Sequence, residues 1–305
     1  ARPVRSFPVR APAPLSPINV LTWCLTLLGL GLAGWAGVLS RRLLYPERRP
    51  IPPPTSAPAS TSHTLRAPDG VGFDVWQLTP LLPPRGRILL CHGYSANRYQ
   101  VLDIADGLRR RGYEALIFEL RGHGERPGPC TLGARETEDA LTVLRWARAR
   151  EGAARVPAGV LGLSMGAAVA CQVAARDPEV RAVVADSPYA KLCPVLRRAI
   201  TQRYRFTGAP AAWLAWWGLQ LARGRRLSRL DPVVLAPRLR QPLFAIQGGE
   251  DRRVAPLLGQ EFYERWAGPK ERWYEPAVAH VGMFARHPEE YCTRVADFFA
   301  RALTG

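Results

Sequence analysis

The chain has 305 residues, and its 42 Lys and Arg residues against 25 Asp and Glu residues give a formal net charge of +17 at pH 7. Only Lys191 and Lys270 are lysine, the arginines are scattered, and no nucleic-acid-binding motif is present, so we exclude nucleic acid as a partner. The six cysteines have no C-x-x-C or metal-ligand spacing, and the five beyond residue 40 are an odd number. We therefore expect no metal site and no complete disulfide framework.

The first predicted element is a membrane anchor at residues 18–40. Before it, residues 1–17 contain five prolines and three arginines, which predicts a disordered basic tail. From Ile18 to Leu39 there are 22 residues without a charge, enough to cross a bilayer core of ~30 Å at ~1.5 Å per residue. Trp23 and Trp35 lie near the two ends, where interfacial anchors are found.

Two other interpretations of this apolar segment are a buried helix and a cleaved signal peptide. The run is longer than a typical signal h-region, and no A-x-A site precedes Arg41 and Arg42, which favours an uncleaved single-pass anchor. Because arginines flank the segment on both sides, the side of the membrane stays open.

A Pro-rich linker is expected at residues 41–61. Proline and small polar residues cannot build a core, so we predict an extended spacer that could hold the next domain up to ~50 Å from the bilayer, at ~3.1 Å per residue. The remaining residues, 62–305, have the size of one α/β domain.

In this domain short apolar runs alternate with amphipathic ones, which predicts a mostly parallel sheet with helices on both faces. Residues 71–78 alternate in polarity and suggest an antiparallel edge strand. Further strands are predicted at 87–91, 158–161, 180–185, 242–247 and 270–275, and helices at 101–111, 135–150, 254–266 and 288–302.

About 55 residues separate the strand ending at Asp186 from the one starting near Pro242, far more than a simple crossover needs. We expect a helical insertion at about 188–238. Its tryptophans Trp213, Trp216 and Trp217 either pack it onto the domain or form the wall of an apolar pocket beside a basic rim that touches an anionic membrane.

The segment Gly162-Leu163-Ser164-Met165-Gly166 lies between a predicted strand and a predicted helix. A G-x-S-x-G sequence in that position predicts a nucleophile elbow. Glycine is needed on both sides because the serine occupies a strained turn in which neighbouring Cβ atoms would collide. We therefore predict Ser164 as a nucleophile.

A base and an acid are expected after it, in the chain order Ser, Asp or Glu, His. Asp251 follows a buried strand and His280 lies on a loop after the next strand, 87 and then 29 residues further on. The carboxyl ends of parallel strands share one edge of a sheet, so these side chains can converge there. His280 would take the serine proton, and Asp251 would orient the imidazole.

Alternatives to these two assignments exist. Glu250 is adjacent to Asp251, and Asp186 also follows a strand, so either could supply the acid. His92 and His123 lie near strand ends, where His-Gly motifs more often shape loops than act as bases. For the oxyanion hole we predict the backbone N–H groups of Met165, which follows the nucleophile, and of Tyr94, in a strand-to-helix loop.

These segments together resemble the α/β-hydrolase superfamily, and within it the serine aminopeptidase-like and monoacylglycerol-lipase-like branch. The segments that carry the resemblance are His92-Gly93-Tyr94-Ser95, Glu119-Leu120-Arg121-Gly122-His123-Gly124-Glu125, Gly162-Leu163-Ser164-Met165-Gly166, Asp186-Ser187-Pro188, Gly248-Gly249-Glu250-Asp251 with Val254, and His280-Val281-Gly282. The resemblance covers roughly residues 62–305. It implies an α/β-hydrolase fold with the helical insertion as a cap, and it supports Asp251 as the acid. Glu119 and Arg126 depart from the family pattern of Asp and Ser, at positions that shape a turn.

The predicted function is a membrane-anchored serine hydrolase that cleaves carboxylic esters, including lipid esters or thioesters, through an acyl-enzyme and without a cofactor. A serine peptidase of aminopeptidase type and a non-catalytic α/β-hydrolase scaffold are the alternatives. The natural substrate and the oligomeric state stay open. Since every candidate catalytic residue falls within 62–305, a chain starting near Ser60 is expected to keep its activity on small esters.

Overall fold

The computed structural model describes residues 16–48, 51–54, 57–150, 156–203, 208–223 and 227–304. The predicted basic tail lies outside these residues except for its last two positions. The described residues form an eight-stranded sheet in the order β1-β2-β4-β3-β5-β6-β7-β8. The strands are β1 (Thr61–Arg66), β2 (Gly72–Leu78), β3 (Gly86–Cys91), β4 (Tyr113–Phe118), β5 (Ala158–Leu163), β6 (Val180–Asp186), β7 (Leu243–Gly248) and β8 (Lys270–Glu275).

The sheet is parallel from β4 to β8, and only the pairs that involve β2 are antiparallel. The edge assignment of residues 71–78 was therefore wrong, because β2 lies between β1 and β4 and β1 is the edge strand. Sequence reasoning missed β1 because Thr61–Arg66 is largely polar and mostly exposed, as an edge strand can be. It also missed β4, whose apolar run Ala115-Leu116-Ile117-Phe118 was the available signal.

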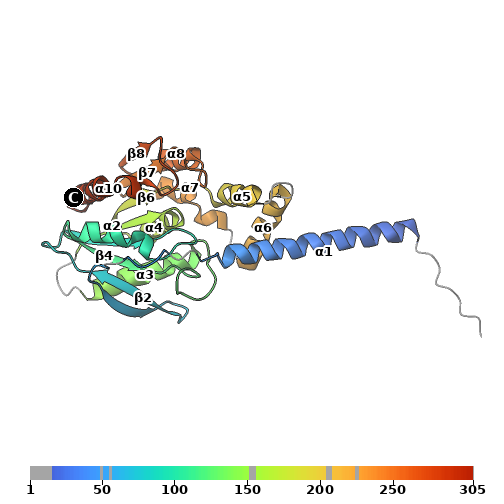
Figure 1. The fold of residues 1–305 in the computed structure, drawn as a ribbon, viewed down its shortest axis with the longest axis horizontal. Helices are drawn as coiled ribbons and strands as arrows, with labels where there is room; N and C mark the ends of the chain where they lie inside the picture. The colour runs from blue at the N-terminus through green and yellow to red at the C-terminus, as the bar shows by residue number, and fades with distance from the viewer. Residues whose placement is uncertain are drawn as a thin grey trace, which may run out of the picture.

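Helices cover both faces of the sheet (Figure 1). Side chains of α2 and α10 pack on one face, and side chains of α3, α4 and α8 pack on the other. The helices are α1 (Pro17–Leu44), α2 (Tyr99–Arg109), α3 (Ala134–Ala149), α4 (Met165–Arg176), α5 (Leu192–Arg203), α6 (Gly208–Arg223), α7 (Pro232–Leu235), α8 (Pro256–Arg265), α9 (Met283–Arg286) and α10 (Pro288–Leu303), with 3-10 turns η1 (Leu227–Leu230) and η2 (Ala236–Arg238).

The insertion between β6 and β7 is helical, as expected, and consists of α5, α6, α7 and the two 3-10 turns. Helix α6 packs against α1 and against α5. Trp213 and Trp217 stack edge to face on α6 with ring centroids 6.1 Å apart, and both are exposed. These two tryptophans therefore do not pack the insertion onto the domain, whereas Trp216 contacts the main core.

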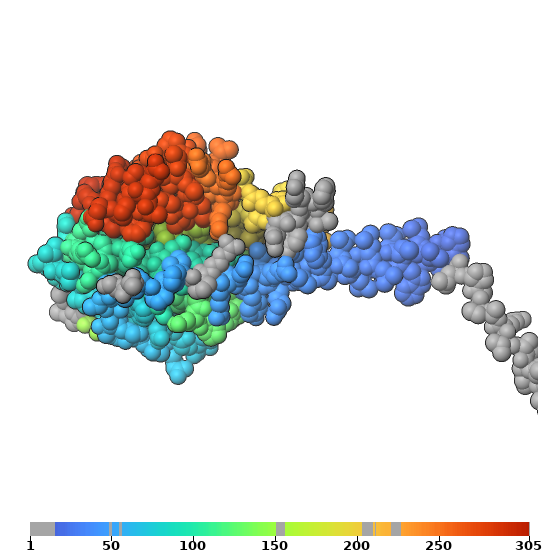
Figure 2. Space-filling model, viewed as in Figure 1, coloured from blue at the N-terminus to red at the C-terminus, as the bar shows by residue number. Residues whose placement is uncertain are grey.

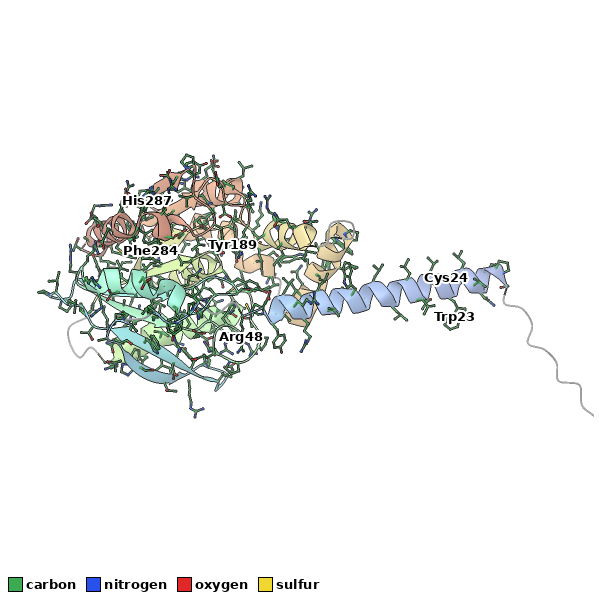
Figure 3. All side chains as sticks on the ribbon, viewed as in Figure 1. Trp23, Cys24, Arg48, Tyr189, Phe284 and His287 are labelled. Atoms are coloured by element: carbon green, nitrogen blue, oxygen red, sulfur yellow. The ribbon has the colours of Figure 1, made fainter. Side chains whose placement is uncertain are left out.

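Helix α1 projects from the domain as a single rod of 28 residues (Figures 1 and 2). The Ser16 hydroxyl caps its start by accepting the Asn19 N–H at 3.3 Å. Only Ala36, Leu39 and Ser40 are buried in it, and Trp23 and Cys24 lie near its far end, away from the domain (Figure 3). Among the described residues it is the one helix long and apolar enough to cross a membrane.

The predicted spacer differs from the structure. Helix α1 continues to Leu44, and both Leu44 and the described residue Ile51 are bonded to the domain instead of holding it at a distance. The Cys130 N–H donates to the Leu44 carbonyl oxygen at 2.7 Å, and the Asn97 amide donates to the Ile51 carbonyl oxygen at 3.0 Å. The last carbonyl groups of a helix have no N–H donor within the helix. The domain supplies such a donor to Leu44, so the end of α1 is bonded directly to the domain.

Candidate active site

Ser164 occupies a sharp turn between β5 and α4. Its φ is 53°, in the left-handed region that serine rarely adopts. The turn is tight enough that a Cβ at Gly162 would overlap the Gly166 carbonyl, and a Cβ at Gly166 would overlap the Cys91 carbonyl. The predicted need for both glycines thus has a direct steric cause, and the turn lifts the serine hydroxyl to the carboxyl edge of the sheet.

His280 and Asp251 lie beside this serine. The distance from Ser164 Oγ to His280 Nε2 is 2.9 Å, and that from His280 Nδ1 to Asp251 Oδ2 is 2.6 Å. Because a carboxylate can only accept, Nδ1 carries the imidazole proton and Nε2 is left to accept the proton of the serine hydroxyl. The three side chains therefore form one hydrogen-bonded chain whose direction runs from serine to aspartate.

Asp251 is held from its own loop. Its Oδ1 accepts the backbone N–H groups of Arg253 at 2.9 Å and Val254 at 2.8 Å, so the carboxylate is fixed independently of the histidine. The side chain is fully buried. Glu250, the neighbouring alternative, is exposed, and its N–H donates to the Val278 carbonyl oxygen.

Asp186, the other alternative acid, contacts different partners. It accepts the Ser187 hydroxyl at 2.9 Å and the Tyr291 hydroxyl at 3.1 Å. Burial raises the pKa of the Asp186 carboxyl to about 6. The Ser187 Oγ in turn accepts the N–H of Val281, next to His280, at 2.9 Å. Sequence reasoning assigned no role to Ser187, although its place just after a buried strand was an available signal.

The two predicted oxyanion residues line the same cavity as Ser164 and His280. Met165 is the first residue of α4, where a backbone N–H has no acceptor within its helix. Tyr94 lies in a turn after β3. The turn is braced by the Gly93 N–H, which donates to the Gln100 side chain at 2.7 Å. Both residues therefore border the cavity that contains the Ser164 side chain.

His92 and His123 shape the surrounding loops and do not reach Ser164. His92 accepts the Leu120 N–H at 3.0 Å through Nε2, and its Nδ1 donates to the Gly93 carbonyl at 2.8 Å. Burial lowers the pKa of His92 to about 3 and that of His123 to about 4, so both are neutral near pH 7.

Glu119 and Arg126, the two departures from the family pattern, close one turn. The Glu119 carboxylate accepts the N–H groups of Arg98 and Glu125, at 3.0 and 3.1 Å. Arg126 donates to the Glu119 carbonyl at 3.0 Å and pairs with Asp139 at 2.9 Å. Neither side chain is bonded to Ser164, His280 or Asp251.

The cavity at the serine has a volume of about 660 Å³, within the range of small-molecule sites. Its walls are mainly apolar and come from the elbow, the oxyanion loop, α5 and the last turn of α1. Tyr189, at the start of the insertion, is one of them (Figure 3). A larger hollow of about 930 Å³ lies beside Val180 and Pro242, at the opposite edge of the sheet, and contains none of the predicted site residues.

A mostly parallel sheet with a serine elbow after β5 and a histidine loop after β8 defines an α/β-hydrolase. The chain belongs to the serine aminopeptidase family S33, whose pattern matches residues 82–236, slightly more than half of the chain. An uncharacterized protein of Mycobacterium tuberculosis is 28% identical over 244 residues, which cover 79% of this chain and 80% of that protein. The protein YqkD of Bacillus subtilis is 25% identical over 236 residues, covering 76% and 77%.

Solved structures are similar over most of the chain. The Pyrococcus furiosus esterase Pf2001 superposes with a TM-score of 0.69 at 25% identity, covering 85% of this chain and 99% of the esterase. An esterase domain of a Rhodothermus marinus protein gives 0.61 at 18% identity, covering 80% and 99%, which supports the fold alone. The family and the 25% identical esterase identify the chain as a hydrolase.

Proposed function

We propose that this hydrolase cleaves carboxylic esters through an acyl-enzyme, with Ser164 as nucleophile, His280 as base and Asp251 as the residue that orients it. The observation that carries the proposal is the hydrogen-bonded chain of these three side chains at an apolar cavity. The similarity to an esterase at 25% identity is consistent with it.

In the acylation step, Ser164 Oγ attacks the ester carbonyl carbon while its proton passes to His280 Nε2. The carbonyl oxygen becomes an oxyanion, which the backbone N–H groups of Met165 and Tyr94 stabilise. When the intermediate collapses, the bond to the alcohol oxygen breaks, and His280 returns the proton to the departing alkoxide. Asp251 stabilises the transient imidazolium.

Deacylation repeats these steps with water. His280 takes a proton from the water as its oxygen attacks the acyl carbon, the same N–H groups hold the second oxyanion, and the carboxylic acid leaves as Ser164 Oγ regains its proton. No cofactor takes part in either half of the reaction.

An ester is favoured over a peptide with a free amino end by the lining of the cavity. A carboxylate is the strongest hydrogen-bond partner for an α-ammonium group. None of the described residues that line the cavity is Asp or Glu, and Arg253 is the one Lys or Arg among them. An apolar ester group needs no such partner.

We also propose that α1 anchors the chain in a membrane. Leu27 and Leu30 are each 64% exposed, and an apolar surface of this length is costly in water. A buried core helix would not have such exposure. Against a cleaved signal peptide, the last turn of α1 is bonded into the domain through the Leu44 carbonyl.

The test is labelling with a fluorophosphonate probe together with turnover of p-nitrophenyl esters and aminoacyl amides. Ser164→Ala should abolish labelling and lower kcat by ~10⁶, as nucleophile removal does in serine triads. Labelling that persists in the variant would refute Ser164 as nucleophile. Faster turnover of the amides than of the esters would favour the peptidase, and a folded wild type without labelling would indicate a scaffold.

A further inference from the structure

The last turn of α1 reaches the cavity that contains Ser164. Leu43 is partly buried and lines this cavity, together with residues of the elbow and of the oxyanion loop. The same side chain packs against the main core and against a small cluster formed by Leu39, Ile200, Ala212 and Ala215. Leu43 therefore belongs both to the helix that would enter a membrane and to the wall of the candidate active site.

Polar bonds fix this turn in place. The Tyr94 hydroxyl donates to the Leu43 carbonyl oxygen at 2.8 Å, and the Cys130 N–H donates to the next carbonyl, that of Leu44. One turn earlier, the Ser40 hydroxyl donates to the Ala215 carbonyl of α6 at 3.3 Å. Since Tyr94 also carries a predicted oxyanion N–H, the end of α1 and the oxyanion loop are tied to each other.

The facing wall of the cavity is apolar and belongs to α5. Leu192, Val195, Leu196 and Ala199 have the spacing of one helix face, and all four line the cavity. Leu43 and these four side chains present hydrocarbon to the cavity, which suits an acyl chain better than a charged or sugar group.

We propose that Leu43 is a specificity-determining residue and that the acyl chain of a medium- or long-chain ester lies between Leu43 and α5. The inference rests on the ester hydrolysis proposed above. It makes the predicted anchor part of the substrate site, and it places the acyl pocket where α1 meets the domain. A substrate whose acyl chain comes from the lipid phase fits that position.

The test compares full-length wild type, Leu43→Trp and Leu43→Ala in detergent, on p-nitrophenyl esters from acetate to dodecanoate. An indole at residue 43 narrows the space beside α5, so the ratio of kcat/KM for decanoate to that for acetate should fall tenfold or more. Leu43→Ala should shift the preferred chain length upward. Val38→Trp is the matched control, because Val38 is on α1 but exposed and outside the cavity, and it should leave the ratio unchanged.

An unchanged ratio in both Leu43 variants would overturn the inference, as would a shift of the same size in Val38→Trp. Labelling of Ser164 by fluorophosphonates with ethyl and decyl chains gives a second measurement that does not depend on turnover. There, Leu43→Trp should slow the decyl probe more than the ethyl probe. If Ser164→Ala leaves ester hydrolysis intact, the proposed function fails; if it abolishes hydrolysis while chain length has no dependence on residue 43, only this inference fails.

Discussion

At the scale of single residues, two buried aspartates at neighbouring strand ends have different tasks. Asp251 accepts two backbone N–H groups and the imidazole proton of His280. Asp186 instead accepts two hydroxyl groups, and burial raises the pKa of its carboxyl. Both residues follow a parallel strand, so their position in the sheet does not distinguish them. Their different tasks come from the atoms that surround each carboxylate.

Asp251→Asn is therefore expected to lower kcat by on the order of 10⁴, because an amide at this position can donate to Nδ1 and stabilise the wrong imidazole tautomer. Asp186→Asn and Glu250→Gln should cost far less. Steady-state kinetics on a short ester measure all three, with circular dichroism as a check on folding. A larger loss in Asp186→Asn than in Asp251→Asn would move the acid to the end of β6.

At the scale of elements, the end of β6 positions both the proposed nucleophile and the proposed base. The Asp186 carbonyl accepts the Ser164 N–H at 2.8 Å, and the next residue, Ser187, holds the His280 loop through Val281. Ser187 and Val281 both have positive φ, at 52° and 55°, so the two turns are strained and need this bond between them. One strand end thus sets the distance between serine and imidazole.

Removal of that bond should act on kcat and not on KM. Ser187→Ala leaves the Val281 N–H without its acceptor and loosens the imidazole, for which we expect a fall in kcat of ~10-fold or more. Ser228→Ala, an exposed serine on η1, is the control. A rise in KM of about tenfold with kcat unchanged would mean that Ser187 affects substrate binding and does not position His280.

At the scale of the whole molecule, the end of α1 packs directly on the domain. Helix α6 lies across α1 where α1 meets the domain (Figure 1), with Trp213 and Trp217 exposed on it. Tryptophan is enriched at the interface between lipid and water, so this part of α6 suits the headgroup layer if α1 spans the bilayer. The active-site cavity then opens close to the membrane and not at the end of a spacer.

Full-length protein should accordingly stay with membranes after washes in high salt and in alkaline carbonate. Salt screens charge but does not release a spanning apolar helix. Leu28→Arg is a matched variant, because an arginine in the middle of a spanning segment costs about 3 kcal/mol, and more of it should be recovered in the soluble fraction. Release of the wild type by salt alone would show that α1 does not span a bilayer.

Features that depend on short stretches of chain could be predicted from the sequence. The elbow is one, since the crowding around Ser164 comes from residues within a few positions of it and from the strand beside it. The helix of α1 is another, because 22 consecutive uncharged residues have few other stable conformations in lipid. The parallel order of β3 and β5 to β8 also followed from the alternation of strands with helices.

Other features depend on contacts between distant residues, which no local pattern encodes. The polar strand β1 is a strand only because β2 offers it a free edge, and the spacing of Asp186 and Asp251 along the chain could not show which one meets His280. For the same reason the sequence could not show that a residue before Ser60 lines the cavity, and the expectation that a chain from Ser60 keeps its activity on small esters stays a prediction. Leu43 enters the cavity because tertiary packing of α1 on α6, and the bond from Tyr94, bring it there across about 50 residues of chain.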